Sequence, residues 1–402
     1  MRPGMRDSPP DWLGAGMTGG GSVPTDRGRG RVVGPLLAAI LVLGVIGLAV
    51  IPRLTGSKHS AGGSGTPLTK VRVLAGSETA PYLTSAAVTA QLRAFGYQLA
   101  VDTAGSRQIV DRNLKDYDIA FPSNATQAEQ IQQKYHLTRP LYAPFSTPLA
   151  IATFSGIEKS LIAAGVVHED GQTALFDMHA YLDLVAEKKR WPDLPPNPDN
   201  PLSQTNRSVY ITSTDIQTSN SADLYLALAS YVKNGDNVVA DEQTATTVAG
   251  QLARLFQVQG FQGSSTEEPF DDYLTLGISK TPMVMIYESQ FRAAQIAKNG
   301  SITPDRVLMY PTPTIYAKHT VVPFSAPGDA VGRLLTTDPA LQDVAAQYGF
   351  RTADLARQTS SSNHAGLPPP PQLADVVEPP TQNITEKMIK TISELPAQGA
   401  GG

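Results

Sequence analysis

The sequence predicts an α/β fold in two units, set behind a single membrane-spanning segment. Three observations lead to this fold class. Short apolar strands alternate with helical patterns from Lys70 onward, the alternation resumes after a Pro-rich loop, and an uncharged apolar run lies near the N-terminus. Strand–helix alternation is typical of parallel βαβ units, in which helices cover both faces of a sheet. With 41% hydrophobic and 17% charged residues, the chain can bury a core of this kind.

The N-terminal part of the chain predicts a membrane anchor. Residues 32–51 form an apolar run of twenty residues without a charge. At ~1.5 Å per residue this run is long enough to cross the hydrocarbon core of a bilayer. Arg27, Arg29 and Arg31 precede it within residues 1–31, a Gly- and Pro-rich stretch that predicts a disordered tail on the cytoplasmic side. A cleaved signal peptide is the alternative, although its apolar region is usually ~7 to 15 residues long.

Beyond the anchor, residues 52–69 are rich in Gly and Ser and predict a flexible linker to the folded part. Short apolar segments then predict strands at 71–74, 99–101, 118–121 and 149–154. A helical pattern between the first two strands stops at Gly96, as expected for a left-handed residue at a helix C-terminus. This order of elements predicts the first α/β unit, on the outer face of the membrane.

The second half of the sequence repeats the alternation after a Pro-rich loop at 191–201. The apolar and periodic runs predict strands at 209–212, 283–287 and 307–310, and helices at 222–232 and 241–258. Because each half has its own strands and helices, two α/β units joined by crossing segments fit better than one very large sheet.

The C-terminal part, residues 353–402, is polar and Pro-rich as far as Pro380 and predicts an extended, semi-rigid tail. A short amphipathic helix is expected over residues 383–395, with Ile384 and Met388 on its apolar face. That face packs either on the body of the protein or on a partner, and the sequence leaves both alternatives open.

Several segments are informative together: AGSET, DIAFPSNAT, STDIQTSNSADLYLALAS, and MVMIYESQ followed by VLMYPTPTIYAKHTVVPF and QDVAAQYGFR. Over about residues 70 to 352 they resemble the type 2 periplasmic (extracellular) solute-binding proteins, in particular their molybdate-binding-like branch. It implies a two-lobed fold in which each lobe is a mostly parallel sheet flanked by helices. We expect lobe 1 to comprise residues 70–154 and 306–352, and lobe 2 residues 155–305. The resemblance implies reversible capture of a solute between the lobes, not catalysis.

Polar segments follow the predicted strands at the points where helices begin. Open α/β sheets bind ligands outside the carboxyl ends of their strands, and helix N-termini offer unpaired N–H groups. We therefore expect a ligand-binding cleft lined by Ser77, Glu78, Thr79, Ser123, Asn124, Ser219, Asn220, Ser221, Tyr287 and Glu288. The alternative is that the Ser, Thr and Asn residues only cap helices, and that Glu288 only complements a helix dipole. The sign of the ligand's charge stays open.

Composition and motifs exclude several classes of function. The chain has no Cys, which excludes disulfides, thiolate metal sites and thiol catalysis. The formal net charge is −4 although residues 1–58 are basic, so the remainder is acidic and no nucleic-acid partner is expected. No H-E-x-x-H, phosphate-loop or G-x-S-x-G motif is present, and His168 and His179, the closest two of the six His residues, share no helical face. We expect no enzyme, no cofactor and no metal.

Together these observations predict a single-pass cell-membrane protein whose outer part captures a small polar solute, with a permease or another envelope protein as its partner. The rival interpretation is a ligand-free scaffold or sensor of the cell envelope that uses the same fold. Permanent tethering favours the rival somewhat, because transport binding proteins are usually released or lipid-anchored. Transport, sensing and scaffolding all stay open on the sequence alone.

Overall fold

The computed structural model describes residues 67–259 and 262–396. The predicted cytoplasmic tail, the membrane anchor at 32–51 and most of the linker lie outside the described residues. Among the residues that are described, no helix is long and apolar enough to cross a membrane. All of the described residues belong to one compact unit.

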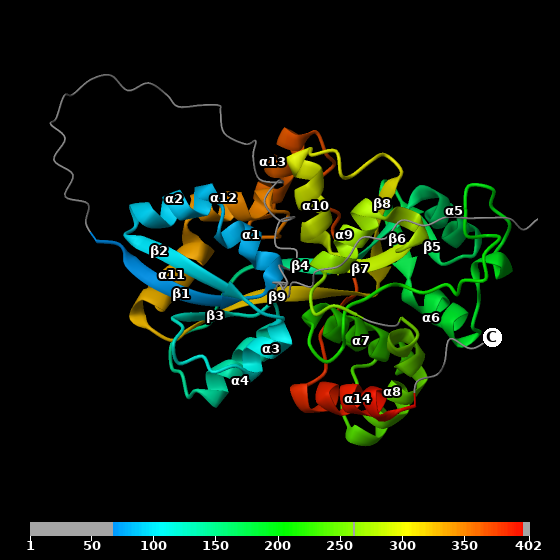
Figure 1. Cartoon of the computed structure of the whole chain (residues 1–402), viewed down its shortest axis with the longest axis horizontal. Coiled ribbons are helices and arrows are strands. Elements are labelled where there is room, and N and C mark those ends of the chain that lie inside the picture. Colours follow the sequence, from blue (N-terminus) through cyan, green and yellow to red (C-terminus); the bar gives the residue numbers. More distant parts are fainter. Residues whose placement is uncertain (1–66, 260–261, 397–402) are drawn as a thin grey trace, which may run out of the picture. The chain divides into compact units, whose positions relative to one another are not determined.

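The described residues form a ten-stranded mixed sheet flanked by helices (Figure 1). The strands are β1 (Thr69–Ala75), β2 (Tyr97–Thr103), β3 (Ile119–Phe121), β4 (Tyr142–Phe154), β5 (Val167–Asp170), β6 (Thr173–Asp177), β7 (Met283–Tyr287), β8 (Arg306–Thr312), β9 (Thr314–Pro323) and β10 (Val376–Val377). The first helices are η1 (Ser77–Thr79), α1 (Ala80–Leu83), α2 (Ala86–Ala94), α3 (Ser106–Asp111), α4 (Ala125–Lys134), α5 (Ser155–Ala163), α6 (Met178–Ala186) and η2 (Trp191–Asp193). The remaining helices are α7 (Asn220–Lys233), α8 (Glu242–Gln257), α9 (Glu267–Thr275), η3 (Gly277–Ser279), α10 (Glu288–Ala297), α11 (Ala326–Thr337), α12 (Pro339–Gln347), α13 (Leu355–Ala365) and α14 (Gln382–Glu394).

The order of the strands divides the sheet into two parts joined by β4 and β9. The order is β2-β1-β3-β9-β4-β8-β6-β5, with β7 beside β4 and β10 beside β9. We call the part built on β1, β2 and β3 lobe 1, and the part built on β5 to β8 lobe 2. β9 pairs antiparallel with β3 of lobe 1 and with β4, whose C-terminal half pairs with β7 and β8 of lobe 2. The finer lobe boundaries, after residues 154 and 305, stay a prediction.

Lobe 1 has the three layers that its sequence predicts. Its strands β2, β1 and β3 are parallel, and helices cover both faces (Figure 1). Because side chains alternate along a strand, Val71 and Val73 of β1 join one apolar cluster with residues of α2, α11 and α12. Leu74 points to the other face and joins a second cluster with residues of α3 and α4. Burial on both faces fixes the register of β1.

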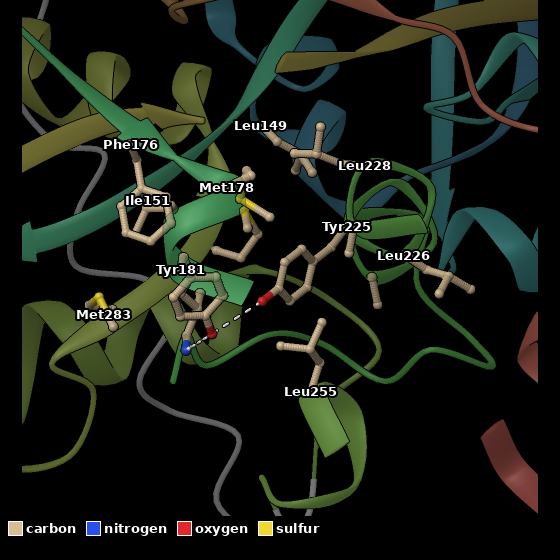
Figure 2. Packing of buried hydrophobic residues seen from close by; sticks show 14 of the residues in the cluster. Leu149, Ile151, Phe176, Met178, Tyr181, Tyr225, Leu226, Leu228, Leu255 and Met283 are labelled. Carbon is tan, nitrogen blue, oxygen red and sulfur yellow. Dashed lines mark hydrogen bonds between the residues drawn. The ribbon is translucent and has the colours of Figure 1, made fainter. Parts of the chain in front are cut away.

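Lobe 2 is built around one large apolar cluster that includes residues of β4, β6, β7, α7 and α8. Figure 2 shows the Tyr225 side chain of α7 reaching toward Tyr181 of α6 inside this cluster. The Tyr181 hydroxyl accepts hydrogen bonds from the Ile211 amide at 3.0 Å and from the Tyr225 hydroxyl at 3.3 Å. A buried hydroxyl without a partner is costly, so these bonds let both rings fill the core.

Three features differ from the sequence-based expectations. The sheet of lobe 2 is mixed and not mostly parallel, because only β6 and β8 pair in parallel while β5–β6, β4–β7 and β4–β8 are antiparallel. A two-residue turn at Gly171 (φ +60°) joins β5 to β6 and forces that pair to be antiparallel. The expected strand at 209–212 forms only an isolated bridge from Thr212 to Val284. The segment expected to be extended after residue 353 includes helix α13.

The C-terminal helix α14 packs its apolar face on the body of the protein, against α8. Its buried residues, which join the lobe 2 core, are Ile384, Met388, Ile389 and Ile392. Ahead of it, β10 adds to the sheet in parallel with β9. The apolar face of α14 is thereby covered within this chain.

Candidate functional site

Polar side chains of both lobes meet around a small cavity. Its lining is mostly hydroxyl-bearing, with one amide, one carboxylate and one phenol: Ser77, Glu78, Gly105 and Ser106 from lobe 1, and Ser219, Asn220, Ser221, Ser264, Ser265, Thr266 and Tyr287 from lobe 2. The space between them has room for about one water molecule. The lobes are therefore nearly closed on one another at this point.

The fold brings these residues together because strands of both lobes end there and helices begin there. Ser77 and Glu78 follow β1, and Gly105 and Ser106 follow β2. The end of β7 supplies Tyr287. The loop before α9 supplies the segment 264–266. The carboxyl ends of strands are the usual ligand sites of open α/β sheets.

The start of α7 is more than a helix cap. Ser219 occupies the N-cap position, yet its side chain makes no capping hydrogen bond. Its hydroxyl instead bonds to the Ser221 hydroxyl at 2.9 Å, which in turn bonds to Thr214 at 2.6 Å. The capping alternative therefore does not account for the Ser219 side chain.

Direct hydrogen bonds cross from lobe 1 to lobe 2 beside the cavity. The hydroxyls of Ser77 and Ser265 bond to each other at 2.8 Å. The Asn124 amide donates to the Asn220 oxygen at 3.0 Å, and the Asn220 amide donates to the Tyr287 hydroxyl at 3.0 Å. Asn124 also caps α4, since its own oxygen accepts from the Thr126 amide at 2.9 Å. Asn124 thus serves as a cap and as a contact between the lobes.

Gly105 lets the two backbones approach closely at the rim of the cavity. A Cβ atom added at this position would lie 2.6 Å from the carbonyl oxygen of Thr218. Real Cβ atoms do not come that close to another atom, so any other residue would hold the lobes apart here.

Glu78 is the acidic group of the cavity. Burial raises the pKa of its carboxyl, although a hydrogen bond donated by the Ser123 hydroxyl opposes that effect. Ser123 is itself linked to the Ser106 hydroxyl at 2.6 Å. The His319 ring lies behind, with Nδ1 at 3.7 Å from Glu78 Oε1, which is too long for a hydrogen bond. Burial lowers the pKa of His319 to about 3, so this imidazole is neutral near pH 7.

A charged cluster lies beside the cavity and joins three helices. Arg107 of α3 contacts Asp223 of α7 at 3.4 Å and Glu386 of α14 at 2.6 Å. It also donates to the Gln217 carbonyl at 3.1 Å. Burial raises the pKa of Asp223 to about 6, and the positive charge of Arg107 opposes that shift. The Arg107 cation is therefore already shared by two carboxylates.

The structure brings most of the predicted site residues together. Those that line the cavity are Ser77, Glu78, Ser219, Asn220, Ser221 and Tyr287. Ser123 and Asn124 stand directly behind them, bonded to Glu78 and Asn220. Thr79 is buried and donates to the Gly76 carbonyl at 2.8 Å, so its hydroxyl is used within its own turn.

Glu288 is not among the residues that line the cavity. Its carboxylate is fully buried and accepts hydrogen bonds from Arg351, from Nε at 2.6 Å and from Nη2 at 2.7 Å. The Tyr310 hydroxyl donates a further bond at 2.7 Å. Both oxygens of Glu288 are therefore occupied by groups of this chain.

Sequence reasoning missed several residues of the cavity. Ser106 follows the second strand just as Ser77 follows the first, so the same rule extended to β2 would have found it. Ser265 lies in a Gly- and Ser-rich loop before α9 that follows no strand, and no pattern in the sequence marks it. His319 and Arg107 reach the site only through folding.

The cavity offers hydrogen-bonding groups and one carboxylate, but no set of metal ligands. Within the described residues, no group of three or more His, Asp or Glu side chains could hold a metal ion. The lining fits a small polar molecule held by several hydrogen bonds.

Comparisons with known proteins bear on the fold of the chain. No protein-family model and no curated protein sequence matches the chain. Among solved structures, apo ferric ion-binding protein A of Pasteurella haemolytica superposes with a TM-score of 0.50 at 11% identity, covering 81% of this chain and 97% of that one. The periplasmic binding protein AfuA of Actinobacillus pleuropneumoniae gives 0.49 at 12% identity, covering 81% and 97%. The sulfate-binding protein SubI of Mycobacterium tuberculosis H37Rv gives 0.47 at 15%, covering 77% and 93%.

The predicted resemblance to type 2 periplasmic solute-binding proteins is confirmed at the level of the fold. The superposition on ferric ion-binding protein A extends over nearly the whole of that protein. The chain therefore has a two-lobed periplasmic-binding-protein fold, made of a mixed α/β sheet with flanking helices. At 11% identity this likeness shows the fold alone.

Proposed function

We propose that this chain is an extracytoplasmic solute-binding protein that captures a small polar ligand between its two lobes. The observation that carries the proposal is the cavity between the lobes, where side chains from the ends of β1, β2 and β7 meet the start of α7. Ligand pockets with this placement are typical of α/β sheets, and a few convergent polar groups orient the ligand.

The chemistry of the lining favours binding over catalysis. A nucleophilic hydroxyl needs a general base within hydrogen-bond reach. The hydroxyls of Ser219 and Ser221 bond to each other, as do those of Ser77 and Ser265, and the nearby His319 makes no hydrogen bond to them. The hydroxyl that contacts the Glu78 carboxylate belongs to Ser123, which stands behind the lining, so this arrangement favours holding a molecule over attacking it.

The solved structures support the class of function without naming the ligand. Their descriptions mention ferric ion, fructose-6-phosphate and sulfate, which differ in size and charge. A ferric ion does not suit this cavity, because its lining holds a single carboxylate, Glu78, no imidazole, and a Tyr287 phenol that burial keeps protonated. The ligand of this chain therefore has to be argued from its own residues.

A membrane tether at 32–51 is part of the proposal and rests on the sequence, because that segment lies outside the described residues. An uncleaved anchor keeps the binding lobes close to the membrane, where a permease or another envelope protein would be the partner. Protease added to intact cells should then remove the lobes and spare residues 1–31. Purified protein that begins beyond residue 51 would instead show a cleaved signal peptide.

A ligand-free scaffold of the cell envelope is the second candidate, and one observation favours it. The lobes bond directly to each other, through Ser77 and Ser265 and through Asn124 and Asn220, and leave room for about one water molecule. A scaffold would keep this closed state permanently. A binding protein must break these bonds to admit a ligand.

A thermal-shift screen of the full chain separates the two candidates. Oxyanions, amino acids, sugars and polyamines would be tested on the wild type, on Asn220→Ala and on Asn234→Ala. Asn234 is a matched control because it lies at the opposite end of α7. Removing one side-chain hydrogen bond costs ~0.5 to 1.5 kcal/mol, or ~1.5 to 3 when the partner is charged. Asn220→Ala should therefore weaken binding between about twofold and about a hundredfold, while Asn234→Ala leaves it unchanged.

The scaffold candidate predicts a different pattern. No compound would raise the melting temperature of the wild type, and Asn220→Ala would only lower stability. That result would refute the proposal of solute capture and would leave the assignment of the fold unchanged.

A further inference from the structure

Resting on the proposed function, we propose that the ligand carries a positively charged ammonium group and that the Glu78 carboxylate receives it. Glu78 is the only charged side chain that lines the cavity among the described residues. The remaining lining side chains are neutral hydroxyls, an amide and a phenol. The only formal charge that this lining can carry is therefore negative.

The surrounding charges add to the negative electrostatic potential at the cavity. Asp223 and Glu267 lie close enough to act on the groups of the cavity, Asp223 on Tyr287 and Glu267 on Glu78. Arg107 is the nearby cation, and it is bound to both Asp223 and Glu386. One cation thus faces several carboxylates. The positive end of α7 offsets part of this field, with a charge of roughly one half.

Glu78 has no cationic partner among the described residues. Its side chain is only 8% exposed, and Ser123 donates to its carboxylate. His319 at 3.7 Å supplies no positive charge, because burial holds its pKa at about 3. Neither nitrogen of that imidazole has a hydrogen-bond partner in the part of the chain that the structure describes. A buried carboxylate without a counter-charge is unfavourable, and a ligand ammonium group would supply one.

The geometry of the cavity matches an ammonium group. Its hydroxyl oxygens, from residues such as Ser77 and Ser221, accept hydrogen bonds, and an ammonium group donates up to three. Tyr287 also lines the cavity, and its hydroxyl oxygen is a further acceptor. An ammonium group is about as large as a water molecule, which is the room that the closed cavity offers. The rest of the ligand would displace the bond between Ser77 and Ser265.

Other charged ligands fit less well. A free oxyanion would place a second negative charge against Glu78, unless that carboxyl were protonated and donated a hydrogen bond. These two cases depend on pH in opposite directions. Binding of an ammonium group tightens as Glu78 loses its proton, whereas binding of an anion weakens.

The other titratable groups around Glu78 do not reverse the expected pH dependence of ammonium binding. His319 on β9 stays neutral above about pH 4, and Tyr287 on β7 stays protonated because burial raises its pKa. Asp223 on α7 has a pKa of about 6, and Glu267 on α9 also has a raised pKa, so ionisation of either adds attraction for a cation. Arg107 on α3 is held between Asp223 and Glu386. The ionisations of Asp223 and Glu267 therefore act in the same direction as that of Glu78.

The test compares matched compounds on the full chain by calorimetric titration and thermal shift. Ethanolamine and ethylene glycol are similar in size and differ in the ammonium group. Choline and putrescine extend the cationic set, and sulfate, phosphate and molybdate form the anionic set. The variants are Glu78→Gln, which removes the carboxylate charge, and Glu129→Gln, which removes the same charge from an exposed position on α4. We expect an ammonium compound to bind the wild type, to lose tenfold or more in Glu78→Gln, and to change less than twofold in Glu129→Gln.

The outcomes separate this inference from the proposed function. Binding of only an anion or a neutral compound, or equal binding of an ammonium compound by Glu78→Gln, overturns the ammonium assignment and leaves solute capture intact. If none of the compounds binds, both the ammonium assignment and the proposed solute capture are refuted. If Glu78→Gln does not fold, the wild type decides the matter. Burial raises the pKa of Glu78 above the ordinary carboxyl value of 4.5, so affinity for the ammonium compound must rise as the pH is raised from that value, and a flat or falling profile overturns the assignment.

Discussion

Replacing Arg351 with Met should destabilise the protein far more than the loss of a surface charge. Arg351 lies just after α12 and forms a bidentate ion pair with Glu288, at the start of α10. The side chain of Glu288 is 0% exposed and that of Arg351 is 9% exposed. Met keeps much of the length of the side chain and removes its charge. The substitution therefore leaves the Glu288 carboxylate buried without its counter-ion.

The size of the effect follows from this burial. Removing one partner of a buried ion pair typically costs ~3 to 5 kcal/mol, because the other charge stays in a low-dielectric surrounding. The Tyr310 hydroxyl still donates to Glu288 in the variant, which favours the lower end of that range. Arg351 also donates to the Pro371 carbonyl at 2.9 Å, so its loss also loosens the segment that leads to α14.

Arg357→Met provides the matched control. Arg357 pairs with Asp343 and Asp354, whose side chains are both 57% exposed, and exposed pairs contribute only ~0 to 1 kcal/mol. Urea unfolding of the full chain, followed by circular dichroism, measures both variants. A double variant, Glu288→Leu with Arg351→Met, should recover part of the loss because both charges of this ion pair are removed, although the nearby Arg292 keeps its charge. If Arg351→Met and Arg357→Met differ by less than about 1 kcal/mol, the reasoning from burial is wrong.

Two further substitutions test other parts of the structure. His319→Leu should make the stability of the protein less sensitive to acid. The pKa of His319 is about 3 in the folded protein and ~6.5 in the unfolded chain, so the wild type loses stability as the pH falls between these values. The acid-unfolding midpoint of the variant should therefore move to lower pH. Gly349→Ala should cost more than ~1 kcal/mol, because φ is +77° and the new Cβ would lie 2.5 Å from the Ser289 carbonyl oxygen. Gly250 lies in the middle of α8 with open space around it, so Gly250→Ala should instead raise stability by up to ~1 kcal/mol. Equal melting temperatures for the two Gly variants would contradict this account.

Local rules predicted much of the fold and part of the site. Strand–helix alternation is a local pattern, and it led to the parallel strands of lobe 1. The rule that polar loops follow strands located Ser77 and Ser123, and the polar start of a helix located Ser219. Each of these predictions needed only the residues on either side of the position.

Features that depend on distant residues did not follow from the sequence. Glu288 pairs with Arg351, which is 63 positions away, so its role as an ion-pair partner became visible only in three dimensions. The mixed order of strands in lobe 2 depends on how β4 inserts between β9 and β8, which follow one another in the chain but lie about 150 residues after β4. Ser265 belongs to the cavity because Ser77 of the other lobe faces it at 2.8 Å.

Under the proposed function, we expect the contacts between the lobes to couple closure of the cleft to the charge of its occupant. In the closed state Glu78 and Asp223 are buried, and the burial raises the pKa of both carboxyl groups. Moving lobe 1 away from lobe 2 exposes them to water and separates Arg107 from Asp223, so the empty cleft gains hydration as it loses one ion pair. An occupant that neutralises Glu78 lowers the electrostatic cost of burying this carboxylate in the closed state. Because a ligand shifts an equilibrium only by its difference in affinity for the two states, such an occupant would hold the lobes together.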